Sequence, residues 1–272
     1  MDIHFIETAR LVALKKADII IHISNWLGER TPGPYWISRA FENGCYLIEG
    51  NRWGLERTVQ FSGGSCVINP DGSIASVIDK GDGLAYADID ISWSRKRQVL
   101  NEKIFDDRRP EMYLNLPTNP YLWNPLDFFG LYGMNPLPKG KESLVSIVQM
   151  NTTNNVNQNL KEILKHLQIA KNNSSELVVF PELALTGHLN KNKSAISKNS
   201  SEISQLANYA NKNNLYICCG FAEKEKKEFY NSSILFGPEG ILGIYRKIHL
   251  NNEDKKWASE GNEWKYYDTK IG

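Results

Sequence analysis

Short strands made almost wholly of apolar residues occur in two separate blocks of the 272-residue sequence, and they restrict its fold more than any other feature. Residues 18–24 and 45–48 form such runs in the first block, and residues 177–180 and 215–221 form them in the second. Helical patterns lie between these runs. A strand that is apolar on both faces needs a covering layer on each side of its sheet. We therefore expect an α/β protein in which the two blocks stack as a four-layer α-β-β-α sandwich.

A weak internal repeat indicates that the two blocks are related. Each block contains a strand, a tight turn of proline, an acidic residue and glycine, and a return strand. The turns are Pro70-Asp71-Gly72 and Pro238-Glu239-Gly240. Proline and glycine at this spacing favour reversal of the chain, so each block is predicted to end its sheet in a hairpin.

Residues 113–142 separate the blocks and have a different composition. They hold five prolines and six aromatic residues. Prolines interrupt helices and central strands, whereas flexible linkers are rich in glycine and serine rather than aromatic residues. We predict an ordered connecting arm between one unit at residues 1–112 and a second at residues 143–272.

Charge and composition exclude several classes of partner. The formal net charge of +1 provides no overall field that would attract nucleic acid or an anionic membrane. The longest aliphatic run, Ile19–Ile21, is far shorter than the ~20 residues of a membrane-spanning helix. The first residues do not resemble a signal peptide. Four scattered cysteines form no disulfide or zinc pattern, which favours a cytoplasmic setting. Dispersed histidines and the lack of a phosphate-binding motif predict no metal or cofactor.

Charged residues in the second block adjoin its apolar strands. Glu182 directly follows strand 177–180, at the carboxyl end where α/β proteins place catalytic groups, and it could act as a general base. Lys247 ends the return strand of the second hairpin and could stabilise an oxyanion. Glu253 and Asp254 follow within seven residues. Each residue taken alone is more often an ordinary surface side chain, so only their combination is informative.

As a set, these residues resemble the amino-terminal half of the nitrilase-like carbon–nitrogen hydrolases. The resemblance implies that Glu182 is the general base and Lys247 the transition-state lysine. It places the family's second acid at Asp254 in an ungapped match, or at Glu253 with a slip of one residue. The segments that carry it are Phe180-Pro-Glu-Leu-Ala-Leu-Thr-Gly187, Tyr230-Asn-Ser-Ser233, Gly237-Pro-Glu-Gly240 and Tyr245-Arg-Lys-Ile-His-Leu250.

The first block resembles the other half of the same kind of domain. Residues 2–10 match the segment that follows the family's nucleophilic cysteine, which would stand before Met1, and Ile6 replaces a proline of that motif. Residues 267–272 look like the lead-in to the strand that carries such a cysteine. The resemblance thus implies a carboxy-terminal half followed by an amino-terminal half. Further matches are Ser24-Asn-Trp26, Asn51-Arg-Trp-Gly54 and Arg108-Arg-Pro-Glu-Met-Tyr113.

The family's chemistry implies hydrolysis of a small amide, carbamoyl compound or nitrile by a Glu-Lys-Cys site whose cysteine lies outside this chain. A homo-oligomer is also implied. Three arrangements stay open: a fragment of a tandem protein, which we favour, a circularly permuted domain, or a catalytically inactive scaffold or regulatory subunit. Trp26, Tyr35 and Trp53 either line a substrate pocket or pack as ordinary aromatics. The cysteines are expected in the core, namely Cys45, Cys66, Cys218 and Cys219.

Overall fold

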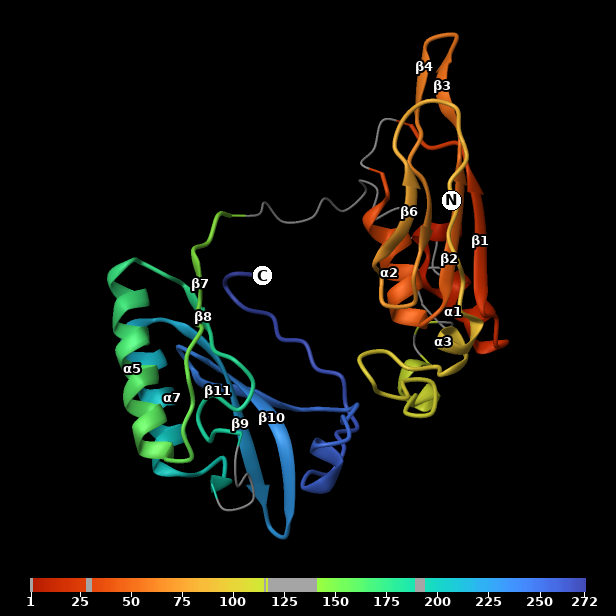
Figure 1. The fold of residues 1–272 in the computed structure, drawn as a ribbon. Coiled ribbons are helices and arrows are strands. Elements are labelled where there is room, and N and C mark those ends of the chain that lie inside the picture. Colours follow the sequence, from red (N-terminus) through yellow and green to blue (C-terminus); the bar gives the residue numbers. More distant parts are fainter. Residues whose placement is uncertain (1, 28–30, 115, 117–140, 189–193) are drawn as a thin grey trace. The chain divides into compact units, whose positions relative to one another are not determined.

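The computed structural model describes residues 2–27, 31–114, 116, 141–188 and 194–272. The chain divides into two compact units, residues 1–108 and residues 109–272, which are described separately (Figure 1). Both are built from helices and mixed sheets, which confirms the predicted α/β class. The division falls slightly before the predicted boundary at residue 112. Most of the predicted connecting arm, residues 115 and 117–140, lies outside the described residues.

Unit 1 has a four-stranded sheet in the order β1-β2-β5-β6, in which only the β1–β2 pair is parallel. A separate two-stranded hairpin, β3–β4, extends from it, and the sequence patterns did not indicate this hairpin. The strands are β1 (Ile19–Ser24), β2 (Tyr46–Asn51), β3 (Trp53–Glu56), β4 (Val59–Ser62), β5 (Ser65–Ile68) and β6 (Ile74–Ile78). The helices are η1 (Asp2–His4), α1 (Ile6–Leu14), α2 (Pro34–Asn43) and α3 (Ile91–Arg95).

Helix α2 has the termini that its sequence predicts. Pro34 occupies the first turn, where a missing N–H costs nothing, and Gly44 follows the helix in a left-handed conformation with φ of +55°. The buried side chains of Trp36 and Ala40 pack against Leu47 of β2 in the core of unit 1. This core fixes α2 on one face of the sheet.

Unit 2 has a five-stranded sheet in the order β7-β8-β9-β10-β11. The first three strands are parallel, and β9, β10 and β11 pair antiparallel. Figure 1 shows α5 and α7 side by side along one face of this sheet. The elements are η2 (Pro110–Tyr113), β7 (Val145–Ile147), α5 (Val156–Asn172), β8 (Leu177–Val179), α7 (Ser201–Asn213), β9 (Tyr216–Glu225), β10 (Glu228–Gly237), β11 (Gly240–Arg246) and η5 (Asp254–Lys256).

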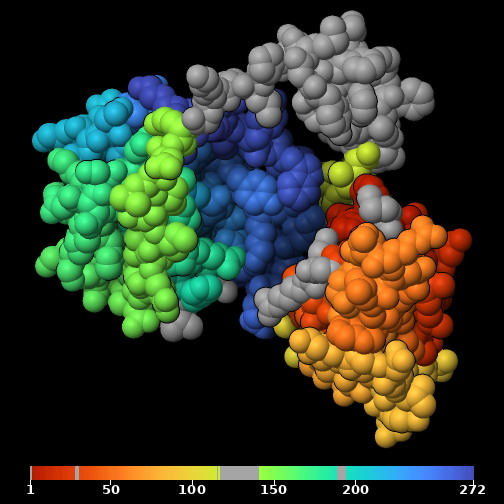
Figure 2. All heavy atoms as spheres, turned by 90° about the horizontal axis from the view of Figure 1, so that it is seen from above, coloured from red at the N-terminus to blue at the C-terminus, as the bar shows by residue number. Residues whose placement is uncertain are grey.

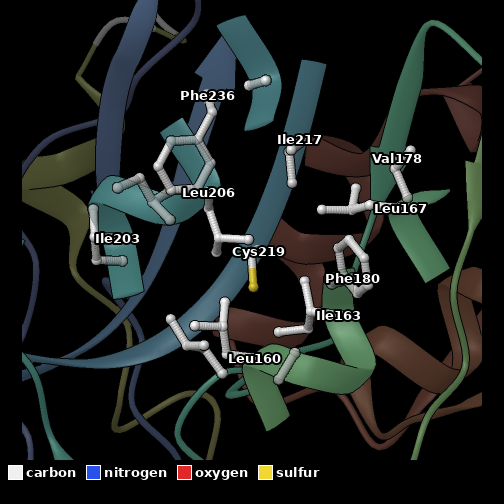
Figure 3. Packing of buried hydrophobic residues seen from close by; sticks show 14 of the residues in the cluster. Leu160, Ile163, Leu167, Val178, Phe180, Ile203, Leu206, Ile217, Cys219 and Phe236 are labelled. Carbon is white, nitrogen blue, oxygen red and sulfur yellow. The ribbon is translucent and has the colours of Figure 1, made fainter. Parts of the chain in front are cut away.

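The core of unit 2 lies between its two helices and the sheet. Leu160, Ile163 and Leu167 recur at helical spacing on α5 and face strand residues such as Val178 and Ile217 (Figure 3). Burying each such side chain contributes roughly 1.5–3 kcal/mol. Figure 2 shows the atoms of this part of unit 2 in green. This packing holds the sheet rigidly, and the sheet in turn positions the loops at the strand ends.

The two units share one plan, which confirms the predicted repeat of hairpins. In each, parallel strands lead into a terminal antiparallel pair, β5–β6 or β10–β11. Within each unit, helices cover one sheet face, while Ile21, Ile23 and Ile147 are 73%, 82% and 84% exposed on the strands β1 and β7. Neither unit by itself, as far as it is described, supplies a second covering layer. Strand β7 is also shorter than the predicted strand at residues 144–150, because it pairs only with the three residues of β8.

Candidate active site

Glu182 lies in a turn that begins where β8 ends. The N–H of Phe180 donates to the carbonyl of Cys218 at 2.8 Å, and the N–H of Leu185 donates to the carbonyl of Gly220 at 3.1 Å. Between these anchors, Leu183 is buried and has a left-handed backbone with φ of +53°. A non-glycine residue in this region is held there by its surroundings at some energetic cost. The turn therefore presents the Glu182 carboxylate from a fixed backbone, with its side chain 50% exposed.

Strand β9 passes unusually close behind this turn, at Gly220. A Cβ atom on Gly220 would lie 2.5 Å from the nitrogen of Leu183, 2.6 Å from the carbonyl oxygen of Pro181 and 2.7 Å from the Cα of Glu182. All three are backbone atoms, which cannot move aside as a flexible side chain could. Glycine is therefore required here by close approach rather than by its backbone angles.

Lys247 follows β11 and reaches toward Glu182. Its ammonium Nζ donates to Glu182 Oε1 at 3.0 Å and to Asp254 Oδ2 at 2.7 Å. Its backbone is fixed on both sides: the N–H donates to the carbonyl of Asn231 at 2.8 Å, and the carbonyl accepts from the N–H of Gly261 at 2.9 Å. The lysine thus bridges two carboxylates that come from distant parts of unit 2.

Asp254 and Glu253 are adjacent in sequence but lie in different surroundings. Asp254 is 4% exposed and accepts hydrogen bonds from Lys247 and, at 3.2 Å, from the indole Nε1 of Trp257. The Glu253 side chain is 70% exposed and forms an ion pair with Lys256, three residues further on. The structure therefore brings Asp254 together with Glu182 and Lys247, whereas Glu253 pairs at the surface.

Asn231 is a member of this cluster that the sequence did not single out. Its amide Nδ2 donates to Glu182 Oε1 at 2.7 Å and lies 3.2 Å from Asp254 Oδ2. It is 4% exposed on β10, between Tyr230 and Ser232. Its place in the motif Tyr230-Asn-Ser-Ser233 was the available signal, and its burial accounts for its hydrogen bonds, because buried polar groups are nearly always hydrogen-bonded.

The charges of the cluster are partly compensated. Burial alone disfavours the charged form of Lys247, but hydrogen bonds to Asp254 and Glu182 outweigh it and raise the pKa of this ammonium above its usual value. Lys247 therefore stays protonated at neutral pH and can stabilise negative charge. Among the described residues, no group of three or more histidine, cysteine, aspartate or glutamate side chains could hold a metal ion.

The four cysteines lie in the strands or beside them, and burial raises the pKa of each thiol. Cys45, Cys66 and Cys219 are buried, and Cys218 is partly exposed. For Cys66, burial and the neighbouring carboxylate of Glu49 raise the pKa to about 12. The thiolate is the nucleophilic form of cysteine, so these environments oppose its formation. The prediction that the cysteines belong to the core is confirmed for the three buried ones.

In unit 1, Trp26 and Tyr35 lie together with two further aromatic rings. The ring of His4 is tilted against both, with centroids 5.1 Å from Trp26 and 4.8 Å from Tyr35, and the ring of Trp36 is 6.0 Å from that of Trp26. Trp53 instead belongs to the β3–β4 hairpin. Two of the three aromatics considered as pocket residues are thus part of one packed cluster.

Comparison with known proteins assigns the chain to a family. The sequence profile of carbon-nitrogen hydrolases matches residues 1–97 and 144–272, which is most of the chain. The chain belongs to the carbon-nitrogen hydrolase family. Residues 98–143, between the matched segments, contain the predicted connecting arm. The family assignment therefore covers both blocks, and it agrees with the resemblance that the sequence motifs indicated.

The chain matches individual members of the family over about half of their own length. A nitrilase of Pyrococcus abyssi is 32% identical over 125 residues, covering 43% of this chain and 48% of the relative. A probable nitrilase of Schizosaccharomyces pombe is 31% identical over 127 residues, covering 43% and 47%. A superfamily member from Xanthomonas campestris, solved with an arsenic adduct in its active site, has a TM-score of 0.44 and 22% identity, and the likeness covers 48% of this chain and 51% of that one. The chain thus spans about half the length of the curated relatives it matches. No described helix has the length and apolar character that crossing a membrane requires.

Proposed function

We propose that unit 2 carries the acid–base part of a hydrolase site for non-peptide carbon–nitrogen bonds, with a small amide, carbamoyl compound or nitrile as substrate. The observation that carries this proposal is the contact of Lys247 with both Glu182 and Asp254, at 3.0 Å and 2.7 Å. Glu182 is the general base, Lys247 stabilises the transition state, and Asp254 is the second acid. Asn231 positions the two carboxylates.

The chemistry requires a thiol next to Glu182. With an amide or carbamoyl substrate, Glu182 takes the thiol proton, and the thiolate attacks the substrate carbon to form a tetrahedral intermediate. The ammonium of Lys247 stabilises the negative charge that develops on the substrate oxygen. Protonated Glu182 returns its proton to the leaving nitrogen, and ammonia departs. Water then gives a proton to Glu182 and attacks the thioester, which releases the acid and regenerates the thiol.

We propose that the nucleophilic cysteine lies outside these 272 residues. Two observations support this. The thiols present have raised pKa values in the sheets or beside them, which suits core residues rather than nucleophiles. In addition, none of the four cysteines stands in the sequence context of the family's nucleophile motif.

The same reasoning supports the four-layer sandwich as the arrangement of a complete site. Each sheet has one face covered by helices and isoleucines exposed on its strands, including Ile23 at 82% and Ile147 at 84%. Apolar strand residues exposed in this way are usually covered by a second layer of structure. A sheet from another half-domain would provide that layer.

Ammonia release is the decisive assay for the proposed function. We expect the 272-residue chain to release no ammonia from small amides, because it provides no thiolate beside Glu182. The coding DNA upstream of Met1 and downstream of Gly272 should contain an in-frame cysteine codon, and the longer protein should hydrolyse an amide, carbamoyl or nitrile compound. Glu182→Gln should abolish that activity.

Glu253→Gln is the matched control, since it removes an acid next to Asp254 that pairs at the surface. It should retain activity, whereas Asp254→Asn should lose most of it. Stop codons directly upstream of Met1 and downstream of Gly272 would instead favour the alternative that the chain is a catalytically inactive scaffold. Ammonia release by the 272-residue chain that survives Glu182→Gln would overturn the assignment.

A further inference from the structure

A short segment of unit 2 packs against the region that carries Lys247. It consists of Arg109 and the 3₁₀ helix η2 (Pro110–Tyr113), and we call residues 109–113 the strap. The family resemblance places these residues at the end of the first block, but the structure groups them with unit 2. The proposed mechanism gives them no role.

Arg109 contacts the backbone that holds Lys247. Its Nη1 donates to the carbonyl of Gly261 at 2.5 Å and lies 3.4 Å from the carboxylate of Glu260. The N–H of the same Gly261 donates to the carbonyl of Lys247 at 2.9 Å. A Cβ atom on Gly261 would lie only 2.1 Å from the carbonyl oxygen of Arg246, so this residue is tightly packed on the lysine segment. A movement of Gly261 would therefore be transmitted to Lys247.

Tyr113 provides a second connection, through His249. The Tyr113 hydroxyl is hydrogen-bonded to His249 Nε2, and the two rings stack with centroids 5.7 Å apart and planes inclined by 18°. The indole Nε1 of Trp264 donates to the carbonyl of Met112 at 2.8 Å and its ring lies 6.2 Å from that of His249. His249 follows Lys247 by two residues. The contact of Tyr113 with His249 therefore holds the chain directly after Lys247.

The strap contributes little to the core. No residue of η2 is buried, and the contacts described above are hydrogen bonds, an ion pair and ring stacking rather than apolar packing. Loss of one such contact should therefore leave unit 2 folded and act mainly on what the strap touches. A catalytic group must be held to within roughly 0.5 Å of its productive position, usually by residues that do not themselves react.

We propose that the strap positions Lys247, with Arg109 acting through Gly261 and Tyr113 through His249. The inference rests on the proposed function for its meaning, because it treats Lys247 as the lysine that stabilises the transition state. Arg109 and Tyr113 are positioning residues, since Arg109 bonds to Gly261 and Tyr113 to His249, and both partners hold the backbone around Lys247. By holding the backbone, they keep the ammonium between Glu182 and Asp254.

The test measures Lys247 itself in the 272-residue protein and needs no nucleophile. Trace acetic anhydride is added, and the acetylation rate of each lysine is determined by peptide mass spectrometry. Arg109→Gln and Tyr113→Phe should each raise the rate at Lys247 about threefold relative to Lys165 on α5, as a fall of about half a unit in its pKa would do. Arg109→Lys, which keeps a cationic donor, should give an intermediate rate.

Arg95→Gln is the matched control, because Arg95 is 71% exposed in unit 1 and pairs with Asp18. It should leave Lys247 unchanged. An unchanged acetylation rate of Lys247 in both Arg109→Gln and Tyr113→Phe would overturn the proposal. An equal rise in the rate of Lys165 would also overturn it, because it would indicate a loss of packing throughout unit 2. If a longer protein released no ammonia while Lys247 still responded to the strap, the proposed function would fail and the positioning role would stand.

Discussion

Replacing Gly220 by alanine should disturb the turn that carries Glu182 without touching any polar group of the site. The added methyl would lie 2.5–2.7 Å from three backbone atoms of residues 181–183, inside the distance at which one of the two segments must shift. Strand β9 is central in the sheet and is paired on both sides, at Val178 and Ser233 among others. We therefore expect the turn, rather than the strand, to move.

The magnitude follows from two opposing effects. Inserting a methyl into a closely packed site costs typically about 1–3 kcal/mol. Alanine also restricts the unfolded chain, which returns about 0.4–1 kcal/mol. Because all three contacts are with backbone, the cost should lie at its upper end, and we expect a net loss of roughly 2 kcal/mol for Gly220→Ala. Gly50→Ala in β2 is the control, since its methyl would meet only Ile23 at 3.7 Å, an ordinary contact.

Hydrogen exchange and urea denaturation, measured on the same variants, distinguish an effect on unit 2 from an effect on unit 1. In Gly220→Ala the amides of Phe180 and Leu185, which bond to β9, should exchange faster, and the acetylation rate of Lys247 should rise as Glu182 is displaced. Gly50→Ala should leave these amides unaffected. A Gly220→Ala protein with unfolding free energy within about 0.5 kcal/mol of the parent and unchanged protection at Leu185 would refute the close-packing argument.

Two further predictions concern ionisation. The pKa of Lys247 is raised above its ordinary 10.5, so the stabilisation by its ion pairs is fully present below that pH and is lost as pH rises through the folded-state pKa. The difference in unfolding free energy between the parent and Lys247→Met, measured by urea titration, should therefore be constant through neutral pH and shrink above about pH 10.5. A difference that grows above this pH would contradict the prediction. Cys66, with a pKa of about 12 against an ordinary 9.0, should carry roughly a thousandfold less thiolate and resist iodoacetamide until urea unfolds unit 1. Rapid labelling of Cys66 in the native protein would show that this thiol is not buried.

The sequence predicted those parts of the fold that depend on local chemistry. The limits of α2 are set by Pro34 and Gly44, and the hairpin turn at Gly72 needs a left-handed residue with φ of +82°. Such requirements can be read from neighbouring residues. The β3–β4 hairpin was missed because its strands, such as Val59–Ser62, hold no buried residue and lack an apolar run.

The candidate site could be predicted only in part, for a related reason. Glu182 and Lys247 adjoin apolar strands, so their positions at strand ends were visible in the sequence. Choosing between Glu253 and Asp254 required knowing which side chain faces Asn231, and that depends on the 3₁₀ turn at residues 254–256. One residue of difference in a 3₁₀ turn rotates a side chain by about 120°, which spacing alone does not specify.

The arrangement of charge explains why this cluster suits a proton acceptor. Two carboxylates, Glu182 and Asp254, share one ammonium, so the site keeps an excess negative charge when all three are ionised. Asp254 is 4% exposed and receives Lys247 at the shorter distance, 2.7 Å, together with a hydrogen bond from Trp257. Glu182 is half exposed and shares Lys247 and Asn231 with it. Under the proposed function, Glu182 is therefore the carboxylate that a thiol can reach, whereas Asp254 is occupied by the shorter and more buried contact with Lys247. In the proposed site, Asp254 thus holds the ammonium of Lys247 in place, and Glu182 is left as the half-exposed carboxylate that faces the nucleophile.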